Sequence, residues 1–244
     1  MQLRFIGCGD AFGSGGRFNT CFQVISPSAT ALIDCGASSM VALRKWGVDP
    51  NSIDTIFITH LHGDHFGGLP FLILDAQLVS RRSRPLTIAG PPGLRDRLTQ
   101  AMEVFFPGSS GIAHKFSLDV IELEPDAAVT IGAVDVLPMR VKHPCGAPPL
   151  AVRLTVDGKS VAYTGDTEWT QALIPVAQDA DLFIAEAYFH DRKVRFHLDL
   201  ETVLAHLDRL RPRRLVLTHM SPDMLGRDFA GRFEVAEDGM VLQV

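Results

Sequence analysis

Apolar positions in the first third of the chain come in short runs separated by glycine-rich turns, a pattern typical of small strands. Residues 3–6 have the composition of a strand, whereas residues 7–16 hold too much glycine for a helix or a sheet. Residues 21–25 and 29–34 predict a hairpin. The continuous β-branched and aromatic run at 53–59 predicts a buried strand, and a group of histidines begins at its end.

Further along the chain, the spacing of apolar residues separates helices from strands. Asp199 can cap a helix that Pro212 ends, and Asp157-Gly158 predicts a two-residue hairpin turn. Helices are expected over residues 38–46, 68–80, 93–106 and 200–210. Strands are expected over residues 85–92, 134–141, 150–156, 160–164, 180–185 and 215–218.

Strands and helices recur in both halves of the chain, and no linker or low-complexity stretch divides them. Because each sheet must bury one face and cover the other, we expect an α/β fold in four layers, an αββα sandwich. A chain of 244 residues can bury a substantial core and is still short enough for one domain. We therefore expect residues 1–244 to form a single domain.

Composition narrows the class of protein. Hydrophobic residues make up 46% of the chain, and the formal net charge of −5 argues against a surface coated with basic residues for nucleic acid. Basic runs at 81–84, 192–195 and 209–214 are interpreted as solvated surface. The sequence shows no secretory signal pattern and no apolar run of the roughly 18 residues that a membrane span needs. We expect a cytoplasmic protein with no membrane partner.

The segment from His60 to His65 carries the strongest chemical signal. It reads His-Leu-His-Gly-Asp-His and follows a predicted buried strand. His60 and His62 can converge on one ion, because a turn lets alternate side chains point the same way, while Asp64 and His65 project toward a neighbouring ion. A merely structural role is disfavoured, because such a cluster would repel itself when protonated. The segment therefore predicts a metal centre.

Three later residues extend this centre, because each follows a predicted strand: His143, Asp166 and His219. Imidazole and carboxylate are ligands suited to Zn²⁺, and the same set accepts Mn²⁺. A carboxylate between two cations is a natural bridge, which favours Asp166 for that role. We expect two Zn²⁺ ions, with Mn²⁺ as the alternative.

The run Thr-His-Leu-His-Gly-Asp-His-Phe-Gly-Gly-Leu-Pro at 59–70 resembles the signature of the metallo-β-lactamase superfamily, and that family's later motifs follow in order over almost the whole chain. The resemblance implies an αββα fold with the metals at the top of the sandwich. It implies the following roles: His60, His62 and His143 for one zinc, Asp64, His65 and His219 for the other, Asp166 as the bridge, and Asp34 as a carboxylate that orients a ligand histidine.

Within the superfamily, the chain is most similar to the ribonuclease Z group of phosphodiesterases. Residues 13–20 resemble its early loop, and Glu186, His197 and residues 217–221 resemble its closing motifs. In that group the glutamate orients a histidine that stabilises or protonates the leaving group. The resemblance therefore makes Glu186 and His197 the candidate general-acid pair, and Asp64 completes the expected catalytic set.

One feature of that group is missing. Its tRNA-processing members carry a long, basic, glycine-rich arm, whereas only residues 124–140 precede His143 after the first predicted sheet. We therefore expect a dinuclear zinc hydrolase that acts on a small or cyclic phosphodiester, or on an RNA end, through a metal-bound hydroxide. A homodimer is a further expectation, because the family often dimerises.

Three other functions stay open at this point. A lactonase or thioesterase of the same fold would use the same ions on a carbonyl, although the Glu186 and His197 pair disfavours it. An iron-dependent oxidoreductase is also possible in this fold, but its flavin-linked di-iron type has a glutamate where this chain has Gly63. A metal-binding protein without catalysis is disfavoured by the full ligand set.

Overall fold

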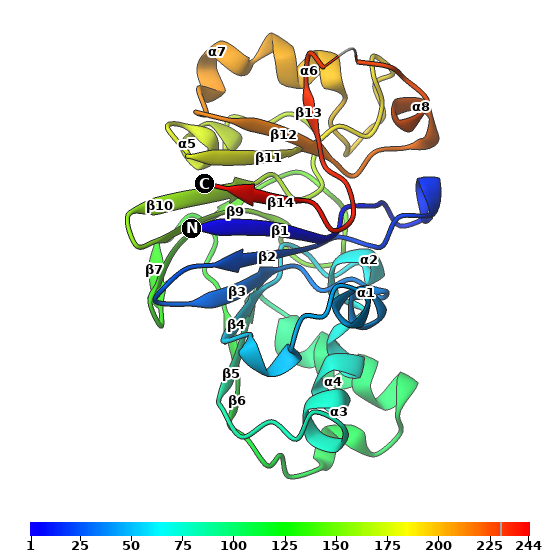
Figure 1. Cartoon of the computed structure of the whole chain (residues 1–244), viewed down its shortest axis with the longest axis vertical. Coiled ribbons are helices and arrows are strands. Elements are labelled where there is room, and N and C mark those ends of the chain that lie inside the picture. The colour runs from blue at the N-terminus through cyan, green and yellow to red at the C-terminus, as the bar shows by residue number, and fades with distance from the viewer. Residues whose placement is uncertain (230) are drawn as a thin grey trace.

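Two mixed sheets stack face to face, and helices cover their outer sides (Figure 1). The computed structural model describes residues 1–229 and 231–244, and within these residues each sheet has seven strands. The α/β fold in four layers, αββα, is therefore confirmed. The first and last strands of the chain, β1 and β14, lie side by side in one sheet, so both termini are near each other (Figure 1).

The first sheet has the strand order β14-β1-β2-β3-β4-β5-β6. Strands β1 to β3 and β14 pair antiparallel, whereas β3 to β6 run parallel. Its strands are β1 (Gln2–Gly7), β2 (Cys21–Ile25), β3 (Thr30–Ile33), β4 (Thr55–Phe57), β5 (Leu86–Gly90), β6 (Leu118–Glu122) and β14 (Val241–Gln243).

The second sheet has the order β13-β12-β11-β10-β9-β8-β7, and β10 to β13 run parallel. The predicted hairpin turn joins β9 to β10, with φ of 51° at Asp157 and 73° at Gly158, as a primed turn requires. Its strands are β7 (Val129–Ile131), β8 (Val134–Arg140), β9 (Leu150–Val156), β10 (Lys159–Tyr163), β11 (Leu182–Glu186), β12 (Leu215–Thr218) and β13 (Glu234–Val235).

Helices α1, α3 and α4 pack on the first sheet, and α5 to α7 pack on the second. Among the described helices, none is long and apolar enough to cross a membrane. The helices are α1 (Ser39–Lys45), α2 (Gly63–Phe66), α3 (Leu69–Leu78), α4 (Leu94–Phe105), α5 (Leu173–Ala177), α6 (Leu200–Ala205), α7 (Leu207–Leu210) and α8 (Pro222–Leu225), with 3₁₀ turns η1 (Ser14–Gly16), η2 (Pro50–Ser52) and η3 (Ser109–Gly111).

The central core lies between the two sheets and draws side chains from both. Phe22 of β2 contacts Phe5 of β1 edge-on at 5.1 Å and Tyr163 of β10 at 5.0 Å, measured between ring centroids. Edge-to-face pairs of this kind add to the stabilisation from burial alone. The aromatic contacts therefore tie the first sheet to the second.

The structure departs from the sequence prediction in the helix expected over 200–210. Asp199 caps α6 as predicted, accepting a hydrogen bond from the Thr202 N–H at 2.9 Å. The helix is broken at His206, however, where φ is −112° and ψ is 6°, and α7 continues after it. The imidazole of His206 stacks on Trp169 at the break. The apolar spacing predicts one continuous helix, but the helix is interrupted where His206 contacts Trp169.

The interpretation of the basic run at 81–84 as solvated surface was wrong for one residue. Arg82 is buried, with 2% of its surface exposed, and its guanidinium donates hydrogen bonds to four backbone carbonyls. An arginine can be buried when nearly all its donors are paired. Arg84, by contrast, is exposed and pairs with Asp54.

Candidate metal centre and acid pair

The carboxyl ends of the parallel strands of both sheets carry the predicted site residues to one place. Asp34 follows β3, and the segment that begins at His60 follows β4 in the first sheet. In the second sheet, Asp166 follows β10, Glu186 ends β11, and His219 follows β12. Because the carboxyl ends of neighbouring parallel strands share an edge of the sheet, these side chains meet where the two sheets adjoin.

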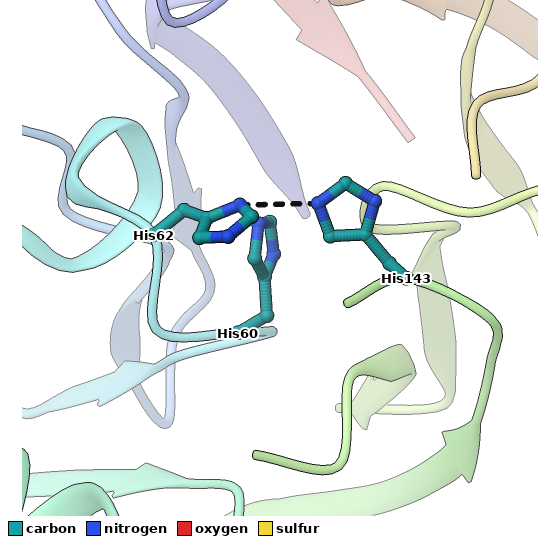
Figure 2. A group of neighbouring side chains, drawn as sticks. All are labelled: His60, His62 and His143. Carbon is teal, nitrogen blue, oxygen red and sulfur yellow. Dashed lines mark hydrogen bonds between the residues drawn. The ribbon is translucent and has the colours of Figure 1, made fainter. Parts of the chain in front are cut away.

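The first group of candidate ligands consists of His60, His62 and His143, shown in Figure 2. One ring nitrogen of each lies within 4.8 Å of the others. His62 Nδ1 and His143 Nε2 face each other at 3.1 Å. His143 Nδ1 is 3.0 Å from the carbonyl oxygen of Phe196, which can only accept a hydrogen bond. His143 Nδ1 therefore carries the hydrogen, and its Nε2 turns a lone pair toward the group.

The second group consists of Asp64, His65, Asp166 and His219, whose ligand atoms also lie within 4.8 Å of one another. His65 Nε2 is 3.2 Å from Asp166 Oδ1, and His219 Nε2 is 3.3 Å from Asp64 Oδ2. Asp166 also approaches the first group, with its Oδ2 at 3.9 Å from His60 Nε2. This carboxylate therefore lies between the two groups, where a bridging ligand would have to be.

Several buried polar atoms here have no hydrogen-bond partner among the described residues. They include His60 Nε2, together with His65 Nε2 and Asp166 Oδ1, which approach each other at 3.2 Å without forming a hydrogen bond. Buried polar atoms are almost always paired, so three unpaired ones in one cluster call for a ligand. A cation would take up the lone pairs that point inward, and imidazole with carboxylate suits Zn²⁺ or Mn²⁺. The residues present thus fit the metal centre that the fold implies.

Asp34 is fully buried beneath the second group and holds His65 in place. Its Oδ2 lies 2.6 Å from His65 Nδ1, so His65 turns its Nε2 toward the ligand cluster. The same carboxylate accepts hydrogen bonds from the Thr59 N–H at 2.7 Å and from the Thr59 hydroxyl at 2.8 Å. A carboxylate that orients a ligand imidazole is a common outer partner in metal sites. The Thr59 contact also ends β4 early, because its N–H bonds a side chain instead of a neighbouring strand.

The two groups differ in charge. Burial, together with the neighbouring imidazoles, lowers the pKa of His60, which keeps its ring neutral and able to bind a cation. Burial also opposes protonation of His65, but the carboxylates of Asp166, Asp64 and Asp34 outweigh it and raise the pKa of this ring. The carboxylates therefore make the second group strongly attractive to positive charge, which a metal ion would supply.

Glu186 and His197 form the pair that the resemblance predicted. Glu186 is fully buried, and its Oε1 is hydrogen-bonded to His197 Nδ1. Its Oε2 accepts the backbone N–H groups of Thr167 and Leu198, at 3.0 and 3.2 Å. Burial lowers the pKa of His197, but the hydrogen bond and charge of Glu186 outweigh it and raise that pKa. His197 is thus held by one nitrogen and favoured in its protonated form.

A cavity of about 310 Å³ lies over these groups and includes residues that the sequence analysis did not single out. Tyr188 lines it, with its ring 5.1 Å from that of His197, and Phe12 stands at its rim with 82% of its surface exposed. Buried Asp10 shapes the loop beneath Phe12 by accepting the N–H groups of Phe12 and Ser14. Tyr188 lies two residues after Glu186 in the same motif, so its place in the sequence could have identified it as a site residue.

The chain is similar to known proteins over almost its whole length. The family described as "Anti-Pycsar protein Apyc1" matches residues 1–240. Ribonuclease Z of Geobacillus kaustophilus is 27% identical over 279 aligned positions, which cover 91% of this chain and 88% of that protein. The crystal structure of the short form of human tRNase Z is 29% identical, covers 100% of this chain and 99% of that one, and superposes with a TM-score of 0.80. The metallo-β-lactamase fold protein YhfI of Bacillus subtilis is 21% identical, covers 99% of both chains and superposes with a TM-score of 0.78. The expected fold and the likeness to ribonuclease Z are therefore confirmed.

Proposed function

This chain belongs to the Apyc1 family, and from that premise we propose that it is a dinuclear metal-dependent phosphodiesterase acting on a small cyclic phosphodiester, with cyclic nucleotides as the first candidates. The observation that carries the proposal is the Glu186 and His197 pair beside two groups of metal-binding side chains. A proton donor held next to a cation site suits a reaction in which an alkoxide must leave. The cavity volume of about 310 Å³ also favours a small substrate.

We propose that the two side-chain groups hold two Zn²⁺ ions, with Mn²⁺ as the alternative. When bound, the two cations would lower the pKa of a water molecule and offset the negative charge of the phosphoryl oxygens. The proposed ligands are His60, His62 and His143 for one ion, Asp64, His65 and His219 for the other, and Asp166 shared between them. The unpaired buried atoms and the central position of Asp166 support this division.

The chain's own residues would handle the proton. Glu186 binds His197 at Nδ1, which leaves Nε2 as the nitrogen that can give a proton to the leaving oxygen. Asp34 would keep the ring hydrogen of His65 on Nδ1 and its Nε2 turned toward the second ion. We further propose that residues 1–244 act as one catalytic domain, since the core between the sheets is built from both halves of the chain.

A substrate panel tests the reaction class. The metal-reconstituted protein would be assayed on bis(p-nitrophenyl) phosphate, on 3′,5′- and 2′,3′-cyclic nucleotides, on a tRNA precursor, and on lactones and thioesters. We expect hydrolysis of the phosphodiesters and little or no processing of the tRNA precursor. Hydrolysis of lactones or thioesters without any phosphodiesterase activity would overturn the proposal.

The metal assignment needs a separate measurement. Elemental analysis of the purified protein would distinguish zinc or manganese from iron, and an oxygen electrode would detect an oxidase or oxygenase. We expect two equivalents of zinc or manganese per chain and no oxygen uptake. Asp166→Asn should reduce both the bound metal and the activity, whereas His114→Ala, which changes a histidine away from both groups, should affect neither.

A further inference from the structure

A second and larger cavity adjoins the candidate site. Its volume is about 640 Å³, and it shares Val194 and His197 with the cavity over the metal-binding groups. His197 therefore borders both spaces. A substrate whose leaving oxygen met His197 would extend into this second cavity on the far side of the bond that breaks.

The wall of the second cavity is aromatic. Trp169 and His206 line it and stack on each other, with ring centroids 3.6 Å apart and an angle of 10° between the planes. The guanidinium of Arg209 lies 5.8 Å from the Trp169 ring centroid. Trp169 also packs against the buried cluster beneath the second sheet, which anchors the stack in position. A stacked aromatic pair thus forms part of the cavity wall.

The lining of the cavity carries charges of both signs. Lys193 and Arg195 come from the segment that precedes His197, while Glu168 and Glu201 come from other parts of the lining. Glu168 is held by Lys142 and by the N–H of Phe196, at 3.5 and 3.4 Å. Aromatic rings bind nucleobases by stacking, and charged and polar groups at the edge can pair with a base and its sugar. The volume lies within the range of small-molecule sites.

From this arrangement we infer that the second cavity binds the nucleobase on the leaving-group side of the substrate, with the stack of Trp169 and His206 as its platform. The inference rests on the proposed function, because that function places the leaving oxygen at His197. The inference makes Trp169 a specificity residue, which distinguishes nucleotides from phosphodiesters without a base. Trp169 takes no part in the proton transfer itself.

Binding can be measured without any reaction. The chain has two tryptophans, so Trp46→Phe leaves Trp169 as the only one to report by fluorescence. Adenosine and cytidine, which have no bond to hydrolyse, would be titrated into this metal-loaded variant, with ribose as the control. We expect saturable quenching by the nucleosides and none by ribose. Unchanged emission up to millimolar nucleoside would overturn the inference.

Kinetics provide the second test. Trp169→Leu should raise KM for 3′,5′-cyclic nucleotides about ten-fold with little change in kcat, because base stacking on an aromatic side chain contributes about that much binding. Trp169→Phe should restore most of the loss, and glycerol 1,2-cyclic phosphate, which has no base, should be hydrolysed equally by all three proteins. Phe12→Leu, at the exposed rim of the first cavity, serves as the comparison variant. A rise in KM with Phe12→Leu and none with Trp169→Leu would place the base over the other loop and overturn the inference.

The two proposals fail in different ways. Nucleoside quenching of Trp169 in a protein that hydrolyses no phosphodiester would support the nucleobase site and overturn the proposed reaction. Phosphodiester hydrolysis that is unaffected by Trp169→Leu on every substrate would support the reaction and overturn the nucleobase site.

Discussion

His197→Ala should separate substrates by the quality of their leaving group. His197 is half-buried, its Nδ1 is bound to Glu186, and its other nitrogen borders the cavity, so the ring is positioned as a proton donor. A positioned general acid contributes about 10²- to 10⁴-fold to the rate. At about 1.36 kcal/mol for each factor of ten, this corresponds to roughly 2.7–5.4 kcal/mol of transition-state stabilisation.

The contribution depends on how much the departing oxygen needs a proton. The sugar alkoxide released from a cyclic nucleotide is strongly basic, whereas p-nitrophenolate leaves as a stable anion. Loss of His197 should therefore lower kcat at least about 100-fold on a cyclic nucleotide and less than about ten-fold on bis(p-nitrophenyl) phosphate. Steady-state kinetics of both substrates at matched zinc content would measure the difference, with His114→Ala as the control. Equal losses on the two substrates would refute the assignment of His197 as the acid.

Three further predictions address the support of the site and the fold. Asp34→Asn keeps the side-chain shape and tolerates the left-handed backbone, but it removes the negative charge that lies beside His65 Nδ1. Zinc affinity, measured by competition with a chelator, should therefore fall about 10- to 100-fold. An unchanged affinity would contradict the role of Asp34. Arg82→Ala leaves buried carbonyls unpaired and should lower the free energy of unfolding by about 3 kcal/mol in urea, whereas the exposed Arg84→Ala should cost less than about 1 kcal/mol. Burial raises the pKa of Asp181, but the N–H of Ser160 and the charged side chains of Lys159 and Arg213 outweigh burial and lower that pKa. Its ionised form therefore stabilises the fold above the unfolded pKa near 3.8, and this contribution is lost as the pH falls through the lower folded pKa. The difference in urea midpoint between the wild type and Asp181→Asn should be full at pH 7 and shrink between about pH 4 and pH 2; a constant difference would exclude the ionic origin.

Much of the site could be predicted because its residues stand at the ends of apolar runs. The strand before His60 and the strand before His219 are visible from composition alone, and strand ends of one direction meet at one edge. The ligand cluster therefore follows from local patterns and simple topology. Glu186 and His197 are different, since only the family resemblance connected them, and the structure brings Glu186 Oε1 into contact with His197 Nδ1.

Other features could not be predicted because they depend on contacts between distant segments. Arg82 lies in a basic run that is typical of surface, and its burial depends on carbonyls from the turn near Pro50 and the chain near Ile53. The stack of Trp169 on His206 joins the loop after β10 to the break between α6 and α7. Neither residue has a sequence spacing that points to the other. Tertiary contacts of this kind override local propensity.

Two of the candidate site residues have an unusual backbone conformation. Asp34 and His219 have positive φ, at 60° and 56°, in the left-handed region that non-glycine residues seldom adopt. The turn at His219 lets its N–H bond the carbonyl of Cys8, at 3.2 Å, just after β1 of the opposite sheet. The Thr218 hydroxyl donates to the same carbonyl at 3.3 Å. The strained turn therefore links the two sheets at the edge where the ligands gather. Glycine at 219 would relieve the strain but would remove an imidazole from the second group, so the proposed role of His219 in metal binding accounts for a non-glycine residue at this position.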